Sequence, residues 1–86
     1  MARYRIDVDH AAAKALAGFD TRIRIRLTAA IDTLADDPRP SRSIKLAGGS
    51  GEWRIRVGDY RIVYEIHDGR LLVLVVRVAH RREVYR

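Results

Sequence analysis

The chain has 86 residues, enough for one small domain, and its 17 basic residues against 11 acidic ones give a net charge of +6. It contains no cysteine, which excludes disulfides and thiolate sites, and its hydrophobic content of 48% is too high for a disordered chain. The longest apolar run, residues 71–76, is far shorter than a membrane span, and residues 1–7 lack the apolar segment of a signal peptide. We therefore expect a single cytoplasmic domain over residues 1–86, with no membrane partner.

The first half of the chain predicts one strand followed by two helices. Residues 2–8 alternate as a short strand, Asp9 can cap a helix through residues 11–16, and Gly18 can end it. Asp20 can cap a second helix, and Pro38 lies just beyond its end. The apolar positions of this second helix recur at helical spacing: Ile23, Leu27, Ala30, Ile31 and Leu34.

The second half changes to the period of β-strands. Residues 52–57 alternate strictly, residues 60–66 form a return strand, and residues 71–78 are apolar on both faces, as in the centre of a sheet. Gly58-Asp59 and Asp68-Gly69 are two-residue turn signals between these strands. The predicted fold class is α+β, with an N-terminal strand and a two-helix hairpin packed on an antiparallel sheet.

The first of these turns fixes the pairing of two strands. With Gly58-Asp59 as the turn, Arg56 lies opposite Arg61, and Arg54 lies on the same face, away from the helices. Like charges directly opposite each other destabilise a sheet, so this arrangement favours a face that binds an anion. The alternative is a solvated arginine face whose side-chain stems cover apolar surface.

The second turn extends the same pairing to the last strand. With Asp68-Gly69 as a two-residue turn, Arg61 lies opposite Val76, and alternation carries His80 onto the arginine face. By the same count Arg77 and Arg81 point the other way. Residues 39–86 contain eleven basic and five acidic residues, so they account for the whole net charge of +6. This asymmetry predicts one positive surface for a polyanion or an acidic protein.

Three segments together resemble the RelE branch of the RelE/ParE toxin superfamily: residues 44–48, residues 53–64 (WRIRVGDYRIVY) and residues 78–85 (VAHRREVY). The resemblance covers nearly the whole chain and implies a RelE-like, microbial ribonuclease-type fold. It also implies a toxin of a type II toxin–antitoxin system that enters the ribosomal A site, cleaves mRNA and so inhibits translation. The implied partners are the ribosome, mRNA, an acidic RelB-like antitoxin and, through the antitoxin complex alone, operator DNA.

The implied chemistry is metal-free attack of the ribose 2′-OH on the adjacent phosphate, without a cofactor. By resemblance, Arg56 and Arg61 stabilise charge on the phosphate, Arg81 matches a late-strand arginine of the family, and Tyr85 orients the base by stacking. Several relatives have lysine where this chain has Arg54 and Arg56, and arginine cannot serve as a base. His80 is therefore the candidate for proton transfer, because an ordinary histidine pKa suits both acid and base work.

The remaining expected RNA contacts are Lys45, Arg54, Arg77 and Arg82. A metal site is not expected, because the three histidines lack metal-ligand spacing. The alternatives without a functional role are a loop histidine at His80, a core aromatic at Tyr85 and a solvated lysine at Lys45. At the level of the whole protein, the alternatives are a ParE-like toxin that inhibits DNA gyrase and a non-catalytic relative that only binds an antitoxin.

Overall fold

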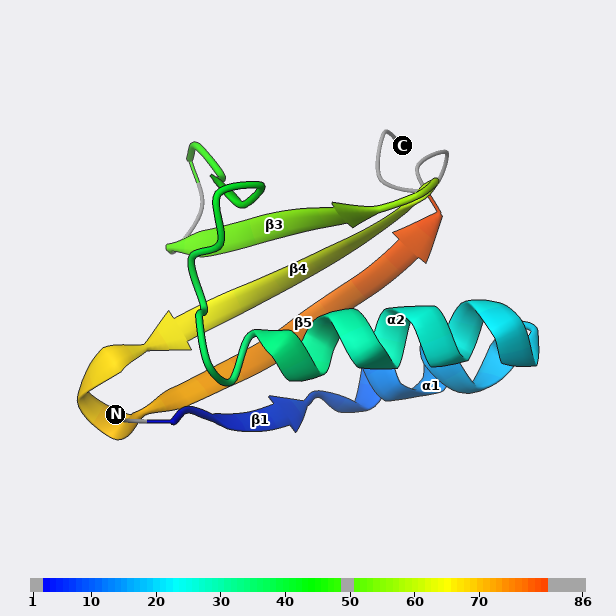
Figure 1. Cartoon of the computed structure of the whole chain (residues 1–86), viewed down its shortest axis with the longest axis horizontal. Coiled ribbons are helices and arrows are strands. Elements are labelled where there is room, and N and C mark those ends of the chain that lie inside the picture. The colour runs from blue at the N-terminus through cyan, green and yellow to red at the C-terminus, as the bar shows by residue number, and fades with distance from the viewer. Residues whose placement is uncertain (1–2, 49–50, 81–86) are drawn as a thin grey trace.

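The computed structural model describes residues 3–48 and 51–80, which form an α+β fold of two helices on one face of a five-stranded sheet (Figure 1). In chain order the elements are β1 (Arg5–Val8), α1 (His10–Gly18), α2 (Thr21–Thr33), β2 (Ile44–Lys45), β3 (Glu52–Val57), β4 (Tyr60–His67), the 3-10 turn η1 (Asp68–Arg70) and β5 (Leu72–His80). The predicted fold class is confirmed. Among these described residues, no helix has the length and apolar character required to cross a membrane.

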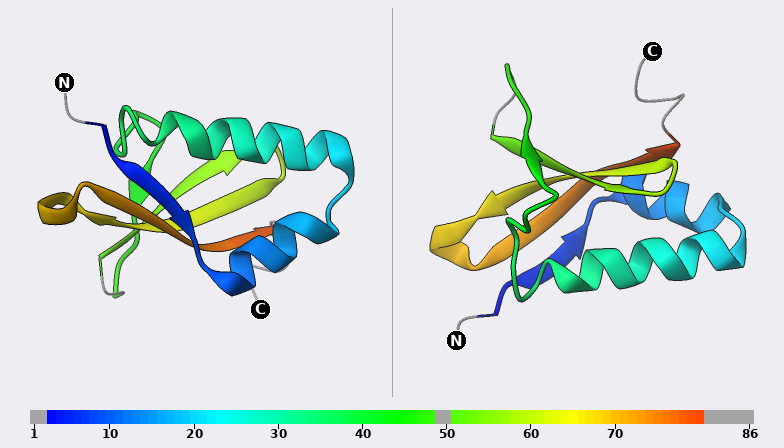
Figure 2. Two further views of the ribbon diagram at one scale, coloured as in Figure 1. Left: turned by 90° about the horizontal axis from the view of Figure 1, so that it is seen from below. Right: turned by 45° about the horizontal axis from the view of Figure 1, so that its top comes forward.

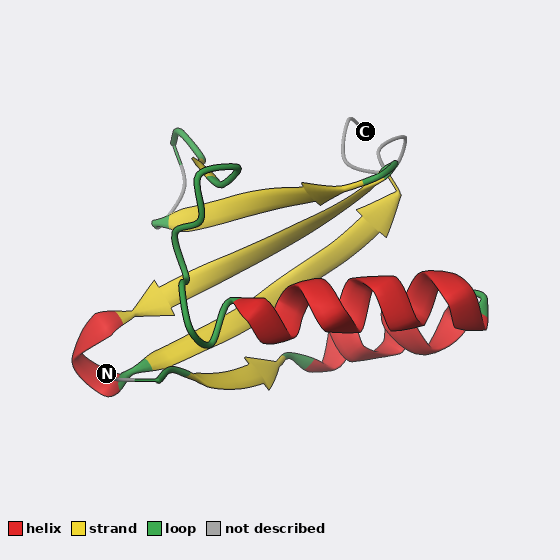
Figure 3. Cartoon of the chain, in the orientation of Figure 1, coloured by secondary structure: helices red, strands yellow, loops and turns green. Residues whose placement is uncertain are grey.

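The sheet has the strand order β1-β5-β4-β3-β2, and the β1–β5 pair is parallel whereas the other pairs are antiparallel (Figure 3). The chain leaves β1 through both helices before it enters the meander, and β1 lies at the edge beside the last strand. β5 is therefore interior, which explains the apolar residues on both of its faces. The sequence predicted the meander but not β2, whose two residues are too few for a periodic pattern.

Both helices begin at the predicted aspartates. The Asp9 carboxylate accepts a hydrogen bond from the backbone N–H of Ala12 at 3.1 Å, and Asp20 accepts from the N–H of Arg22 at 2.8 Å. Each bond satisfies one of the N–H groups that the first turn of a helix leaves without an intrahelical partner. Gly18 is the last residue of α1, and the chain then turns directly into α2, so the two helices lie side by side (Figure 2).

The core lies between the helices and one side of the sheet, which we call the helix face. Four of the five apolar positions predicted for the second helix are buried, one of them Leu34 just past the end of α2, and Ile23 packs at the margin of the core. The largest fully buried side chains are Tyr64, Leu27, Leu34, Ile55, Ile62, Val73 and Val75. We call the opposite side of the sheet, on which neither helix packs, the open face.

The connection from α2 to β2 is tied to the sheet by polar contacts. Arg39 binds the Asp68 carboxylate with both terminal nitrogens, at 2.9 and 3.3 Å, and its guanidinium lies 5.3 Å from the ring centre of Trp53. The Tyr4 hydroxyl donates to the same carboxylate. The hydrogen bonds from Arg39 and then from Tyr4 hold the pKa of Asp68 below its ordinary value.

A buried hydrogen bond also holds the connection from α2 to β2. The hydroxyl of Tyr64, whose side chain is fully inaccessible, donates to the carbonyl oxygen of Pro38 at 2.8 Å. Burial raises the pKa of this phenol. The hydrogen bond satisfies the carbonyl of Pro38, a buried residue outside any helix or strand, and it fixes the chain between α2 and β2.

The predicted register of β4 and β5 is wrong, for two reasons. The connection is not the two-residue turn Asp68-Gly69 but a 3-10 turn followed by Leu71 in the left-handed conformation (φ 49°, ψ 51°). The register also shifts between Val63 and Tyr64, where Val76 of β5 forms a β-bulge. As a result Arg61 lies opposite Ala79 rather than Val76.

Candidate nucleic-acid interface

The β3–β4 hairpin has the register that its turn predicts. Gly58 takes φ +59° as the first residue of the two-residue turn, a conformation that suits glycine. Arg56 consequently lies directly opposite Arg61, and Trp53 lies opposite Tyr64. Residues directly opposite each other point to the same side of a sheet, so both arginines of the pair lie on the open face.

Two further arginines share this face. Arg54 lies opposite Val63 in β3–β4, and Val63 lies opposite Arg77 in β4–β5. Rows of side chains on one face of a sheet are about 7 Å apart along the strands, and alternate strands are about 10 Å apart. We call these four residues the arginine cluster: Arg54, Arg56, Arg61 and Arg77.

The members of the cluster differ in exposure. Arg56 and Arg77 are exposed, Arg54 is partly buried, and Arg61, at 4% exposure, is the most buried charged residue of the described chain. The Nε of Arg54 is buried and makes no hydrogen bond within the described part of the chain. A guanidinium keeps its charge even when it is buried. The cluster therefore combines a fixed, partly desolvated positive charge with exposed cations beside it, which suits a phosphate.

The β5 bulge exchanges the predicted positions of Arg77 and His80. Arg77, expected on the other side, lies on the open face with the cluster. His80, expected there, lies opposite Tyr60 on the helix face, and the two rings meet edge to face with centroids 5.3 Å apart. The rings of Tyr60 and Phe19 also meet edge to face, with centroids 5.1 Å apart. The predicted placement of His80 beside the arginines is therefore wrong.

The other predicted site residues fall outside the cluster. Lys45 is exposed in β2 but lies opposite Trp53, so its side chain belongs to the helix-face side of this edge strand. Arg81, Arg82 and Tyr85 lie outside the described residues.

The sequence analysis did not identify an acidic row on the same open face. Glu52, Glu65 and Asp7 occupy one row across β3, β4 and β1, with Leu74 of β5 between the last two. Oε1 of Glu65 lies 2.8 Å from Nε2 of His67, and Oδ2 of Asp7 lies 3.6 Å from Nη2 of Arg5. Only the register of all four strands brings these carboxylates together. The row limits the positive region to the end of the sheet that holds the β3–β4 turn and the end of β5 (Figure 1).

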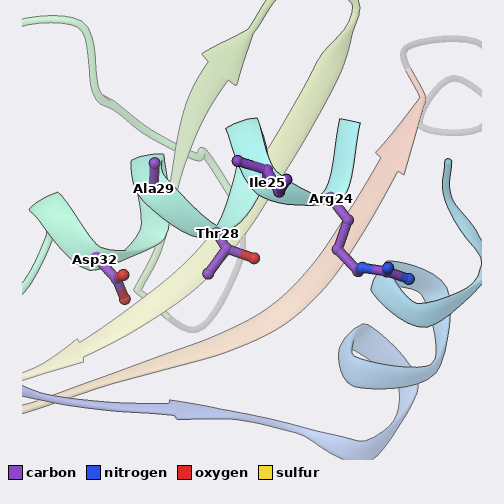
Figure 4. A pocket seen from close by; sticks show the side chains of 5 residues that line it. All are labelled: Arg24, Ile25, Thr28, Ala29 and Asp32. Atoms are coloured by element: carbon purple, nitrogen blue, oxygen red, sulfur yellow. The ribbon is translucent and has the colours of Figure 1, made fainter. Parts of the chain in front are cut away.

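Another feature of the described surface is a depression that lies outside the arginine cluster. The depression on the outer surface of α2 is lined by Arg24, Ile25, Thr28, Ala29 and Asp32, all from one helix (Figure 4). It contains one carboxylate and no histidine, and its Ile25 is 63% exposed. Among the described residues, no three histidine or acidic side chains are grouped so as to hold a metal ion.

Comparison with known families matches residues 3–85 to the ParE toxin of type II toxin–antitoxin systems. A search of curated protein sequences finds no match. Among solved structures, a RelE–RelB complex from the archaeon Pyrococcus horikoshii is similar at 26% identity and a TM-score of 0.81, covering 92% of this chain and 96% of that one.

Two E. coli structures are similar in the same way. The intact RelBE toxin–antitoxin complex matches at 26% identity and a TM-score of 0.78, over 90% of this chain and 95% of that one. The isolated RelE toxin matches at 30% identity and a TM-score of 0.74, over 95% of this chain and 90% of that one.

Proposed function

Because the chain belongs to the RelE/ParE superfamily of type II toxin–antitoxin toxins, we propose that it is a ribosome-dependent endoribonuclease that cleaves mRNA in the A site. The observation that carries this proposal is the arginine cluster. Three strands place four arginines on the open face, with the buried Arg61 directly opposite Arg56. Such an arrangement costs folding stability, and a bound phosphate compensates for it.

The reaction we propose needs no metal. The ribose 2′-oxygen attacks the neighbouring phosphorus and loses its proton to a base, while the bond from phosphorus to the 5′-oxygen of the next nucleotide breaks and that oxygen gains a proton. The products are a 2′,3′-cyclic phosphate and a free 5′-hydroxyl. Negative charge grows on the phosphorane in between, and Arg56 and Arg61 stabilise it, since donors held in place before the reaction contribute most.

The other residues take supporting roles in this proposal. Arg54 and Arg77 bind the flanking RNA backbone from the two outer strands of the cluster. Arg81 adds charge near the scissile phosphate, Tyr85 stacks on a base, and Arg82 contacts the backbone. These three assignments rest on the family resemblance.

The position of His80 argues against a direct part in proton transfer. Its ring packs on Tyr60 on the helix face, whereas Arg61 lies on the open face. We expect a His80→Gln variant to keep cleavage within a few-fold of the parent protein. The shape of the pH profile of single-turnover cleavage should then be the same in the parent and the variant. A strongly reduced rate, with a changed pH profile in the variant, would return His80 to the site.

Primer extension on a reporter transcript tests the proposed activity. We expect cuts after induction of the toxin that are confined to translated codons and that disappear when translation is blocked. Arg56→Gln should slow cleavage by roughly 10²–10³, the usual effect of removing one transition-state donor. Arg70→Gln is the matched control, because Arg70 is an exposed arginine in η1 at the opposite end of the sheet. Cuts in untranslated RNA would indicate a free ribonuclease, and an intact transcript would refute the proposal.

A second candidate function is inhibition of DNA gyrase, favoured by the match of residues 3–85 to the ParE toxin description. The two functions separate in one experiment. If induction stops gyrase supercoiling while the reporter transcript stays whole, the gyrase function is correct.

We also propose an acidic, RelB-like antitoxin as the protein partner, through which alone the chain reaches operator DNA. Similar structures are RelE–RelB complexes, and the net charge of +6 favours an acidic partner. Binding should weaken as salt rises, because screening shortens the range of the attraction. A complex unaffected by salt would contradict this.

A further inference from the structure

A fifth arginine lies at the same end of the sheet as the cluster but comes from a helix. The guanidinium of Arg26, in the middle of α2, rests against the β3–β4 turn. A Cβ atom at position 58 would lie 3.2 Å from Nη2 and 3.7 Å from Nη1 of this side chain. Gly58 therefore leaves the space that the guanidinium occupies.

The turn connects this guanidinium to the cluster. Gly58 follows Val57, and the next pair along the hairpin is Arg56 with Arg61. The strand rises about 3.3 Å per residue, so Arg26 lies one short step beyond that pair, round the end of the sheet. A polyanion that crosses the hairpin end meets Arg56 on the open face and Arg26 on the other side.

The neighbours of Arg26 within α2 do not favour a positive charge at this position. Arg22 and Arg26 are both exposed and lie four residues apart, and like charges at this spacing destabilise a helix. Arg22 also lies in the first turn of α2, where the helix dipole is positive, so it offers Arg26 no compensating environment. Within residues 3–48 and 51–80, Arg26 forms no ion pair, whereas Arg24 is anchored at 3.4 Å to the carbonyl oxygen of Ala17.

We propose that Arg26 binds a phosphate of an RNA strand that runs from the arginine cluster round the end of the β3–β4 hairpin onto α2. The inference rests on the proposed RNA-binding function and adds a contact and a path to it. The turn contacts the guanidinium from one side, and the side chain is exposed, so an RNA strand can reach it from the other. A planar guanidinium held this way suits a phosphate better than a mobile cation does.

Salt-dependent binding tests the assignment. The probe is a short single-stranded 2′-O-methyl RNA, which cannot be cleaved because its nucleophile is blocked, and fluorescence anisotropy gives Kd over a series of KCl concentrations. We expect Arg26→Gln to lower the slope of log K against log salt by about 0.7, the value of one phosphate contact on a single strand. Arg26→Lys should restore the slope because it keeps the charge. Arg70→Gln, an exposed arginine at the far end, should leave the slope unchanged.

Two sources offer such a phosphate, the substrate strand and ribosomal RNA. Anisotropy with the oligonucleotide reports on the first, and salt-dependent cosedimentation with ribosomes reports on the second. A reduced slope in either arm supports the inference and identifies the source. Unchanged slopes in both arms overturn it, as does an equal loss in the Gln and Lys variants, which would mean that Arg26 only braces the turn.

The outcome is separable from that of the proposed function. A reduced slope in a protein that leaves reporter transcripts whole would keep the Arg26 contact and remove the endoribonuclease. Cleavage confined to translated codons, with unchanged slopes, would keep the endoribonuclease and remove the Arg26 contact. Thermal unfolding of each variant confirms that the fold is retained.

Discussion

The Arg56–Arg61 pair predicts that one substitution within the arginine cluster makes the protein more stable. The two residues are directly opposite in β3–β4 and form the pair next to the one that closes the turn. In a two-residue hairpin this pair is not hydrogen-bonded, and the side chains of such pairs lie closest together. Two unit charges about 7 Å apart repel by about 0.6 kcal/mol in water and by more where one is desolvated, and Arg61 is 4% exposed. Replacing Arg56 with Gln should therefore stabilise the fold by about 1 kcal/mol, which raises Tm by about 4–8 °C in a domain of this size.

A double-mutant cycle assigns this gain to the pair. Thermal unfolding by circular dichroism is measured for the parent, Arg56→Gln, Arg61→Gln and the double variant. The gain from Arg56→Gln should nearly vanish in the Arg61→Gln background, and it should shrink in concentrated KCl, where screening acts over a few ångströms. Cleavage should fall in every variant.

Two results would refute this reasoning. If Arg56→Gln lowers Tm, the pair is not repulsive in the folded protein. If the gain persists when Arg61 is already glutamine, it has another origin. In either case the claim that the cluster sacrifices stability to hold a phosphate site would fail.

Three further outcomes follow from the packing. Tyr64→Phe removes the buried hydrogen bond to Pro38 and should destabilise the protein by about 1 kcal/mol, measured by urea unfolding. Arg39 lowers the pKa of the Asp68 carboxyl in the folded protein. The stability from this contact is therefore present above the pKa of Asp68 in the unfolded chain, and it is lost as the pH falls through the pKa in the folded protein. The difference in unfolding free energy between the parent and Asp68→Asn should disappear on acidification, and a constant difference would contradict the ion pair. Gly58→Ala places a Cβ at φ +59° and should cost about 1–2 kcal/mol, whereas Gly58→Asn should cost less.

The register of the β3–β4 hairpin could be predicted because one local feature determines it. A two-residue turn with glycine first allows only one pairing of the flanking strands, and alternation then assigns every side chain to a face. The turn at Gly58-Asp59 placed Arg54, Arg56 and Arg61 on one face, and the register of the structure confirms this placement. The boundaries of both helices were equally local, since the capping aspartates stand next to them in sequence.

The β4–β5 pairing could not be predicted, because contacts distant in sequence determine it. Asp68 is bound by Arg39 and Tyr4, which come from other parts of the chain. The turn that these contacts accompany ends at Leu71 in a left-handed conformation that leucine rarely adopts. Neither the longer turn nor the bulge at Val76 has a residue pattern that distinguishes it from a regular hairpin.

The bulge decides which ionisable groups lie on the open face, and this has a consequence for the pH dependence of the proposed reaction. Unbroken alternation would have placed the imidazole of His80 on the open face. One extra residue, Val76, places the guanidinium of Arg77 there instead. A guanidinium remains protonated wherever the protein is folded. The arginine cluster therefore carries a constant charge from acid to mildly alkaline pH. In the proposed reaction, the change of cleavage rate with pH should then report on the proton-transfer groups alone and not on phosphate binding by the cluster.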